Sequence, residues 1–300
     1  MEYRRVAVVY NPAAGKRRVA RVKEAIEVVR RWVRGVEVLE TRGPGGAVER
    51  AREACRAGVD LVLACGGDGT LHEVINGVAP GETAVGVLPA GTANVVALDM
   101  GLPRDPVRAA EQIPDLVARR VALGRLICRD APPRYFALAC GAGVDAELMY
   151  RTPAAAKKRL GMTAYWLAGF RMLGRRLEVL QASVDGRPRP CTLALVTRVR
   201  EIGGGLRVAR RSHLLDHEME VALFPSRSTL RYVVYMTAAL AGRLAWCTDV
   251  TMLRAARVEL DGSARVEADG EYAGRLPATV DAARDALTLL MPRRFADSGG

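Results

Sequence analysis

Residues 65–74 read CGGDGTLHEV, and they join a run of apolar residues to a segment with helical periodicity. The run LVLAC at residues 61–65 is too continuously apolar for a half-exposed strand, so it predicts a strand that is buried on both faces. Beyond the glycines, apolar residues recur at the spacing of a helix, at Leu71, Val74, Ile75 and Val78. The alternative, a tight hairpin at Asp68 and Gly69, lacks the second strand that it requires.

A loop between a buried parallel strand and a helix lies at the carboxyl edge of the sheet, where unpaired helix N–H groups favour an anion. Glycines let the backbone approach phosphate oxygens closely, and Asp68 suits a magnesium ion or its water shell. Gly66, Gly67 and Gly69 do not fit the G-x-G-x-x-G pattern, and the chain contains no G-x-x-x-x-G-K-[ST]. The loop therefore predicts a phosphate site that belongs to neither a Rossmann dehydrogenase nor a P-loop kinase.

The first third of the chain alternates short apolar runs, at residues 6–10, 61–65 and 85–89, with amphipathic stretches at 19–33 and 45–58. This alternation predicts an α/β domain in which helices flank a parallel sheet.

Beyond about residue 122 the apolar runs become shorter and are separated by Gly, Pro and Asp-Gly pairs, which is typical of an antiparallel β-rich domain. One helical insertion, at residues 227–244, interrupts this pattern. We therefore expect two domains, residues 1–124 and 125–300, with a C-terminal tail that can pack back on the first.

The composition favours a globular protein, because 50% of the 300 residues are hydrophobic and 26% are charged. The first residues lack the long apolar core of a secretory signal, and the longest apolar stretch, residues 232–240, is too short to span a bilayer. The six cysteines form no C-x-x-C pair, so we expect reduced thiols in the core. Together these features predict a cytoplasmic protein.

A net charge of +12 attracts anionic nucleotides, nucleic acids and acidic membrane surfaces alike. Residues 151–177 concentrate seven basic residues and no acidic one, together with Tyr165, Trp166 and Phe170. A basic helix with large apolar side chains can lie on an anionic bilayer, and a buried helix with solvated ends is the alternative. Nucleic-acid binding would rest on net charge alone, so we expect no nucleic-acid partner.

Three stretches of the first domain resemble the diacylglycerol kinase catalytic-domain family: YNPAAGK at 10–16, GGDGTLHEVINGV at 66–78 and LPAGTANVVALDMGLP at 88–103. That family is related to sphingosine kinases and more distantly to NAD kinases. The resemblance continues in the second domain through CGAGVDAEL at 140–148, residues 203–224 and VEADGEYAG at 266–274. It implies an α/β domain of the NAD kinase and phosphofructokinase type, a β-rich lipid-substrate domain, and a cleft between the two.

The resemblance also implies that ATP is the nucleotide and that residues 11–15 and 66–72 surround its phosphates. The implied nucleotide contacts are Asn11, Pro12, Gly15, Thr41, Gly66, Gly67, Asp68, Gly69, Thr70, Gly91, Thr92 and Asn94. From the residues alone, Asn11 and Pro12 could instead form an ordinary strand-ending turn, and Thr92 could be a helix N-cap.

Residues 269–271, Asp-Gly-Glu, read locally as a hairpin turn. The resemblance implies that this turn faces the nucleotide and supplies the acid–base group, which is either Asp269 or Glu271. Both readings are compatible, since a rigid turn is a good mount for a carboxylate. Asp68 completes the implied catalytic set by ordering magnesium.

A structural Mg²⁺ site near residues 212–220 is a further implication of the resemblance, with Asp216 and the backbone carbonyls of His213 and Glu218 as its ligands. His217 stands where the family has glycine, and Ala209 stands where it has proline, so this chain departs from the pattern. Asp216 could simply end a turn. A zinc pair at His213 and His217 lacks an evident third ligand.

These inferences predict an ATP- and Mg²⁺-dependent lipid kinase that transfers the γ-phosphoryl group of ATP to the hydroxyl of a membrane lipid such as diacylglycerol. We expect it to act at an anionic membrane surface, peripherally on the inner face, and a homodimer is possible. One alternative is an NAD kinase-like enzyme with a soluble substrate. The other is a catalytically silent lipid-binding protein of the same fold.

Overall fold

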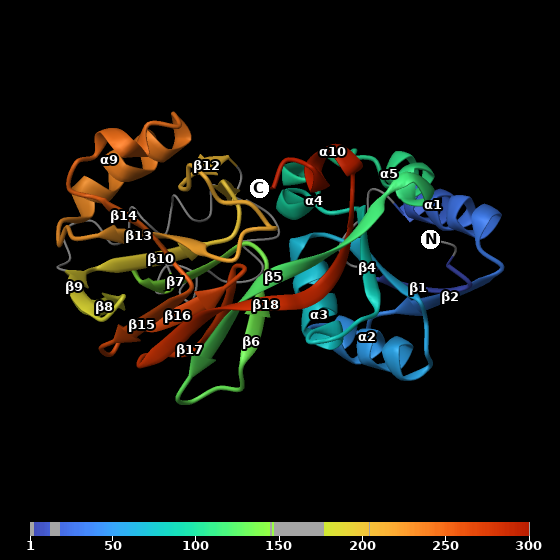
Figure 1. Cartoon of the computed structure of the whole chain (residues 1–300), viewed down its shortest axis with the longest axis horizontal. Helices are drawn as coiled ribbons and strands as arrows, with labels where there is room; N and C mark the ends of the chain where they lie inside the picture. The colour runs from blue at the N-terminus through green and yellow to red at the C-terminus, as the bar shows by residue number, and fades with distance from the viewer. Residues whose placement is uncertain (1–2, 13–18, 145, 147–176, 204, 300) are drawn as a thin grey trace. The chain divides into compact units, whose positions relative to one another are not determined.

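The computed structural model describes residues 3–12, 19–144, 146, 177–203 and 205–299 (Figure 1). The chain divides into two compact units. Unit 1 contains residues 1–123, 214–216 and 284–300, and unit 2 contains residues 124–213 and 217–283.

Unit 1 is built on a parallel sheet, as the alternating pattern predicts. Its strands follow the order β2-β1-β3-β4-β18, and each neighbouring pair in this order is parallel. The strands are β1 (Arg5–Tyr10), β2 (Gly35–Glu40), β3 (Leu61–Gly66), β4 (Ala84–Pro89) and the last part of β18 (Ala278–Met291). All residues of β3 and β4 are buried, which agrees with their continuously apolar sequences.

The helices of unit 1 supply the apolar side chains that cover this sheet. They are α1 (Val19–Trp32), α2 (Gly46–Arg56), α3 (Asp68–Val78), α4 (Val95–Asp99), α5 (Pro106–Gln112) and α10 (Arg293–Ala296), with a 3₁₀ turn at Ile113–Asp115. Val22, Ile26 and Val29 of α1 are buried at helical spacing and join the core formed by β1, β3 and β4. The strand β2 was not predicted, and its side chains are mostly exposed or half-buried at the sheet edge.

Unit 2 is rich in antiparallel β-structure, which confirms the predicted fold class. One sheet has the order β14-β13-β10-β7-β16-β17, and in the other β18 is followed by β15, β8 and β9, with β5 beside β18 and β6 beside β5. The strands are β5 (Val117–Cys128), β6 (Arg134–Phe136), β7 (Ala139–Gly143), β8 (Leu180–Val184), β9 (Arg187–Cys191), β10 (Leu193–Thr197), β11 (Glu201–Ile202), β12 (Leu206–Arg207), β13 (Met219–Phe224), β14 (Thr251–Ala255), β15 (Arg257–Asp261), β16 (Arg265–Ala268) and β17 (Glu271–Arg275).

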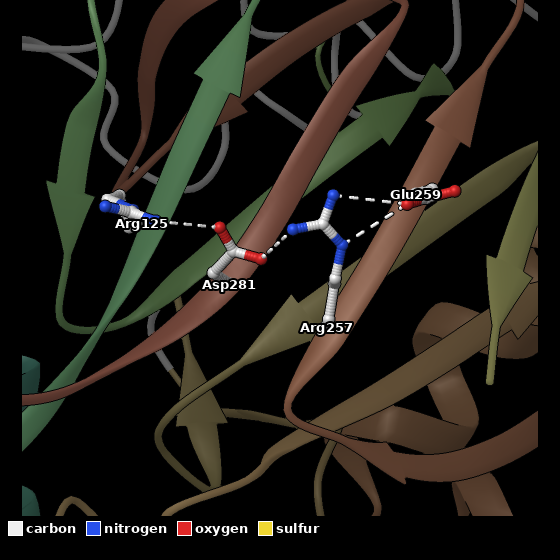
Figure 2. Close-up of polar contacts among 4 residues, drawn as sticks. All are labelled: Arg125, Arg257, Glu259 and Asp281. Atoms are coloured by element: carbon white, nitrogen blue, oxygen red, sulfur yellow. Dashed lines mark hydrogen bonds and ion pairs between the residues drawn. The ribbon is translucent and has the colours of Figure 1, made fainter.

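Charged side chains reinforce the pairing of β5, β18 and β15 in unit 2 (Figure 2). Asp281 of β18 lies between two guanidinium groups, 3.1 Å from Arg125 and 3.2 Å from Arg257. Arg257 also contacts Glu259 of its own strand at 3.2 Å. Because the side chain of Asp281 is only 14% exposed, solvent screens these ion pairs less than it screens ordinary surface pairs.

Asp-Gly pairs do not all play the same role in unit 2. Asp185-Gly186 and Asp269-Gly270 have positive φ at both residues and close the hairpins β8–β9 and β16–β17, as the turn chemistry predicts. Asp261-Gly262 is different, because β15 and β16 belong to separate sheets. There the glycine, with φ of +138°, turns the chain from one sheet into the other.

The helical insertion in unit 2 forms α9 (Thr229–Leu240), which is followed by a 3₁₀ turn at Leu244–Trp246. Arg231 of α9 makes two hydrogen bonds with the carboxylate of Asp249, at 3.2 and 2.7 Å, and Tyr235 donates its hydroxyl proton to the same carboxylate. These bonds, chiefly that from Arg231, lower the pKa of Asp249 to about 2. Among the described residues, no helix is long and apolar enough to cross a membrane.

We predict that Asp249 makes α9 sensitive to acid. Its folded pKa, about 2, lies below the ordinary 3.8, so its stabilising effect is complete above the ordinary value and is lost as the pH falls toward 2. Asp249→Asn should lower the Tm at neutral pH and reduce the loss of stability over that acid range. Thermal unfolding at a series of pH values measures both effects. The exposed hairpin variant Asp185→Asn is the control, and an acid profile of Asp249→Asn parallel to that of the wild type would contradict the prediction.

Candidate active site

The predicted nucleotide residues of unit 1 gather at the carboxyl edge of its sheet. The N–H of Asn11, directly after β1, donates to the carbonyl of Cys65 in β3 at 3.3 Å. Thr41, directly after β2, donates to the carbonyl of Tyr10 at 2.9 Å, and Ala90, directly after β4, donates to that of Gly66 at 2.8 Å. Four successive strand ends therefore present their loops on one edge, where open α/β sheets bind ligands.

Helix α3 begins at Asp68, inside the glycine loop, and this excludes the hairpin alternative. Its N-cap is Gly67, which has no side chain to bond the first N–H groups of the helix. A Cβ on Gly66 would lie 2.3 Å from the hydroxyl oxygen of Thr70, so the loop turns tightly over the first helical turn. The helix start thus combines a positive dipole end with backbone donors, which suits phosphate oxygens.

The loop after β4 packs directly on this glycine loop, backbone against backbone. A Cβ on Gly91 would lie 2.4 Å from the Cα of Gly67, a distance that no side chain could occupy without a shift. Asn94 closes the second loop on itself, since its amide donates to the carbonyl of Gly91 and its oxygen accepts from the Gly91 N–H, both at 3.0 Å. The two loops predicted to bind nucleotide therefore form one continuous backbone surface.

Asp68 ties these two loops together. Its Oδ1 accepts a hydrogen bond of 2.6 Å from the N–H of Val95, the first residue of α4. This bond gives the aspartate a positioning role that the sequence analysis did not foresee. Its predicted role in ordering magnesium stays a prediction.

The other predicted contacts differ in exposure. Pro12 and Thr92 are exposed and Asn11 is half-buried, whereas Thr41, Thr70 and Asn94 are buried. Thr92 is not a helix N-cap, because Asn94 occupies that position before α4. His72, within the predicted phosphate range, is only 4% exposed. Gly15 and nearly all of the basic segment 151–177 lie outside the described residues.

Two buried side chains of this region bear on chemistry. The hydroxyl of Thr41 is buried and makes no hydrogen bond within the described part of the chain, so it has capacity for a ligand that reaches it. Burial raises the pKa of the Cys65 thiol to about 12, so Cys65 is a core residue and no nucleophile. All six cysteines are free, as expected.

We predict that Gly91→Ala damages the nucleotide loops more than Gly67→Ala. The first change places a methyl group 2.4 Å from backbone, whereas the second meets only the Cα of Gly91 at 3.3 Å. Overpacking of this kind costs about 1–3 kcal/mol, so Gly91→Ala should lower the Tm and weaken ATP binding about tenfold or more. Calorimetric titration with ATP and thermal unfolding of both variants test this. Equal effects of the two changes would contradict the close packing of the loops.

The two carboxylates of the predicted acid–base turn in unit 2, Asp269 and Glu271, have different surroundings. The carboxylate of Asp269 accepts hydrogen bonds from the N–H groups of Ala137, Leu138 and Ala139, at 3.0, 2.8 and 3.1 Å. Glu271, at the start of β17, is exposed and makes no side-chain hydrogen bond or ion pair within the described residues. Asp269 therefore holds the turn, and Glu271 presents a carboxylate to solvent.

A third carboxylate beside this turn was missed by the sequence analysis. Glu267 of β16 is 2% exposed and accepts a hydrogen bond of 2.8 Å from the N–H of Gly270. The available signal was a glutamate inside the otherwise apolar strand end VEA before the turn. A buried carboxylate that bonds the turn's own backbone fixes the direction in which the turn projects.

The predicted metal segment, residues 212–220, is organised by protein groups. The carboxylate of Glu220, 7% exposed, accepts from the N–H groups of Arg210 and Arg211 at 2.9–3.1 Å. The buried guanidinium of Arg198 donates from Nη1 to the carbonyl of Glu218 at 2.8 Å. Arg198 thus supplies a protein cation at the carbonyl that the resemblance assigns to Mg²⁺, and the metal role of Asp216, His213 and Glu218 stays a prediction. Within the described residues, no group of three or more His, Cys, Asp or Glu side chains could hold a metal, and His217 is exposed.

We predict that this segment keeps its stability without a metal. EDTA should leave the Tm of the nucleotide-free protein unchanged, whereas Arg198→Met should lower it, because a charge-assisted hydrogen bond contributes about 1.5–3 kcal/mol. Arg200→Met, at an exposed neighbouring position, is the matched control for the loss of charge. A Tm that falls with EDTA and recovers with added Mg²⁺ would overturn this prediction and restore the metal site.

Two family models together match most of the described chain. Residues 5–126 match the diacylglycerol kinase catalytic domain, and residues 139–291 match the YegS C-terminal NAD kinase beta sandwich-like domain. The Bacillus subtilis diacylglycerol kinase is 31% identical over 308 residues, covering 98% of each chain. The chain therefore belongs to the diacylglycerol kinase family, and at the family level it is a lipid kinase.

Solved structures agree on the fold. A Bacillus anthracis protein, solved as a candidate diacylglycerol kinase, superposes with a TM-score of 0.83 at 21% identity and covers 98% of this chain and 97% of its own. The yeast NADH kinase complexed with NADH gives a TM-score of 0.52 at 10% identity, covering 99% of this chain and 87% of its own. These likenesses confirm the predicted α/β and β-rich architecture.

Proposed function

We propose that this protein transfers the γ-phosphoryl group of ATP to the hydroxyl of a membrane lipid, with diacylglycerol as the leading acceptor. The observation that carries the proposal is the backbone surface made by the Gly67 and Gly91 loops at the start of α3, in a chain of the diacylglycerol kinase family. Such a surface binds phosphate oxygens through N–H groups and needs no lysine of the P-loop type.

In this proposal the triphosphate lies over the carboxyl ends of β1, β3 and β4, beside Asn11, the α3 N-terminus and the exposed Thr92. Asp68 holds the two glycine loops in register through Val95. Mg²⁺, when bound with ATP, would neutralise charge on the β- and γ-phosphates, and Asp68 is the residue proposed to order it.

Glu271 is the carboxylate that we propose as the general base. It would take the proton of the lipid hydroxyl while that oxygen attacks the γ-phosphorus and the bond to the ADP leaving group breaks. The supporting contrast is that Asp269 already accepts three backbone N–H bonds, whereas Glu271 is exposed. Both oxygens of Asp269 are thus engaged by the backbone of residues 137–139, whereas the carboxylate of Glu271 is open to a substrate.

The molecule that becomes phosphorylated distinguishes the proposed lipid kinase from the two alternative functions. An NAD kinase-like enzyme would phosphorylate NAD and ignore lipid, and a silent lipid-binding protein would phosphorylate neither. The test is incubation of the protein with MgATP and a total lipid extract, followed by mass spectrometry for lipids that gain a phosphate, with NAD in a parallel reaction. Folded protein that produces no phosphorylated lipid would refute the proposal.

We predict a clear separation between the two turn carboxylates. Glu271→Gln should lower turnover about 10²–10⁴-fold and leave the Tm unchanged, since general-base catalysis contributes on that order and the side chain supports no packing. Asp269→Asn should lower the Tm, because an amide oxygen cannot replace both carboxylate oxygens as acceptors for the Ala137–Ala139 backbone. Kinetics and thermal unfolding of both variants provide the readout. An active Glu271→Gln beside a stable but inactive Asp269→Asn would reverse the assignment.

A further inference from the structure

Helix α9 of unit 2 (orange in Figure 1) carries exposed apolar side chains. Leu230, Val233, Val234 and Leu240 are exposed by 67%, 38%, 44% and 45%. Together with Thr237 and Ala241, also exposed, they recur at i, i+3, i+4, i+7 and beyond, so they form one stripe along the helix. Only Thr229, Tyr235 and Ala239 of this helix are buried.

The exposed stripe carries no charge and no unsatisfied hydroxyl. Thr237 is its one polar residue, and its hydroxyl lies 2.9 Å from the carbonyl oxygens of Val233 and Val234, one turn earlier. The bond is made within the helix, so the stripe can leave water without losing a hydrogen bond. An ordinary solvent-facing helix of a globular protein is polar on this side.

The opposite face of α9 is fixed to the β-structure. The rings of Tyr232 and Tyr235 lie 6.2 and 5.2 Å from that of Phe224 in β13, and the hydroxyl of Tyr232 is 2.8 Å from that of Thr192. The Arg231–Asp249 pair adds two hydrogen bonds. The apolar stripe is therefore held outward on a rigid support.

The chain beyond α9 adds an aromatic side chain and a cation beside the stripe. Gly242, with φ of +67°, ends the helix, and Trp246 follows with 71% of its surface exposed. The guanidinium of Arg243 lies 4.4 Å from the centre of the Trp246 ring. Residues 225–248 contain no acidic residue; Arg231 pairs with Asp249 just beyond them, and Arg227 and Arg243 are exposed.

We propose that the α9 face, defined as Leu230, Val233, Val234, Leu240 and Trp246, docks into the interfacial layer of a bilayer that contains anionic lipids. The inference rests on the proposed function, because it identifies the surface on which the lipid acceptor is reached. An apolar stripe with tryptophan at its end and arginines beside it matches the layered chemistry of an anionic bilayer, acyl chains below and phosphates above.

Charge favours a bilayer over a second copy of this chain. A symmetric contact would bring the exposed Arg227 and Arg243 of one copy toward those of another, in a stretch without carboxylates to receive them. Lipid phosphates supply that counter-charge along the whole face. Arg243 can bind a phosphate while it remains over the ring of Trp246.

The test is flotation of the full-length protein with vesicles of phosphatidylcholine and phosphatidylglycerol, with no nucleotide and no acceptor lipid. Leu230→Glu and Val234→Glu should each weaken vesicle binding about tenfold or more, since each places a charge at the acyl boundary. Val179→Glu makes the same change at a valine with 37% exposure outside α9 and should bind like the wild type. Arg243→Gln should reduce the preference for phosphatidylglycerol over pure phosphatidylcholine.

A second readout guards against misfolded variants. The tryptophan fluorescence that brominated lipids quench should decrease in Trp246→Phe, which keeps the fold at an exposed site and leaves Trp32 and Trp166 in place. Wild-type protein that does not bind these vesicles, or α9 variants that bind as well as Val179→Glu, would overturn the inference. A wild-type dimer that Leu230→Glu dissociates while vesicle binding is unchanged would do the same.

The docking test and the test of the proposed function can fail independently of each other. If the α9 variants lose vesicle binding but the wild type phosphorylates no lipid, the docking surface stands and the lipid-kinase proposal fails. If the variants lose turnover on vesicles and keep it with a short-chain acceptor dispersed in detergent, both stand.

Discussion

The close approach of two backbone segments at the sheet edge of unit 1 is the constraint on which the rest depends. Gly67 and Gly91 are so near that a single Cβ on Gly91 would meet the Cα of Gly67 at 2.4 Å. Nothing but glycine at that position allows the loops after β3 and β4 to merge, and only merged loops offer their N–H groups together to one anion. The parallel sheet supplies the position, because each strand end delivers its loop to the same edge.

Carboxylates in this protein hold backbone in place at several loops. Asp68 accepts from the N–H of Val95, and Glu73 accepts from the N–H groups of Gly45 and Ala47 at the start of α2. In unit 2, Glu220 accepts from Arg210 and Arg211, and Asp269 accepts from residues 137–139 at the start of β7. A carboxylate can satisfy several N–H groups that no strand or helix pairs, and such charge-assisted bonds are stronger than neutral ones. An acidic residue inside a recognisable motif of this chain can therefore have a structural role. Glu271 differs from these carboxylates, because its exposed side chain accepts no backbone hydrogen bond within the described residues.

Much of the fold could be predicted from local patterns, and the failures have physical causes. The continuously apolar β3 and β4, the helical stripe of α3 and the Asp-Gly turns at 185 and 269 each encode their structure within a few residues. The edge strand β2 was not predicted, because only Leu39 of its six residues is buried and its sequence lacks the continuous apolar run of a buried strand. Asp261-Gly262 has the letters of a hairpin, but its flanking strands find partners in separate sheets. The roles of Asp269 and Arg198 depend on backbone groups about 130 and 20 residues away, which no local pattern contains.

The apolar side chains of α9 divide into two groups in the structure, one packed on the sheet and one exposed. Residues 232–240 are apolar enough to suggest burial, yet they are too few to cross a bilayer. In the structure the aromatic side chains Tyr232 and Tyr235 face the sheet, and the larger aliphatic ones at 233, 234 and 240 are exposed. Under the proposed function the acceptor is dissolved in a membrane, whereas ATP and ADP exchange with water, so a permanent anchor would add little. The shallow docking proposed for α9, through a few aliphatic side chains and one tryptophan, would confine the protein to the surface and still let it leave, since affinity at an interface scales with the apolar area buried there.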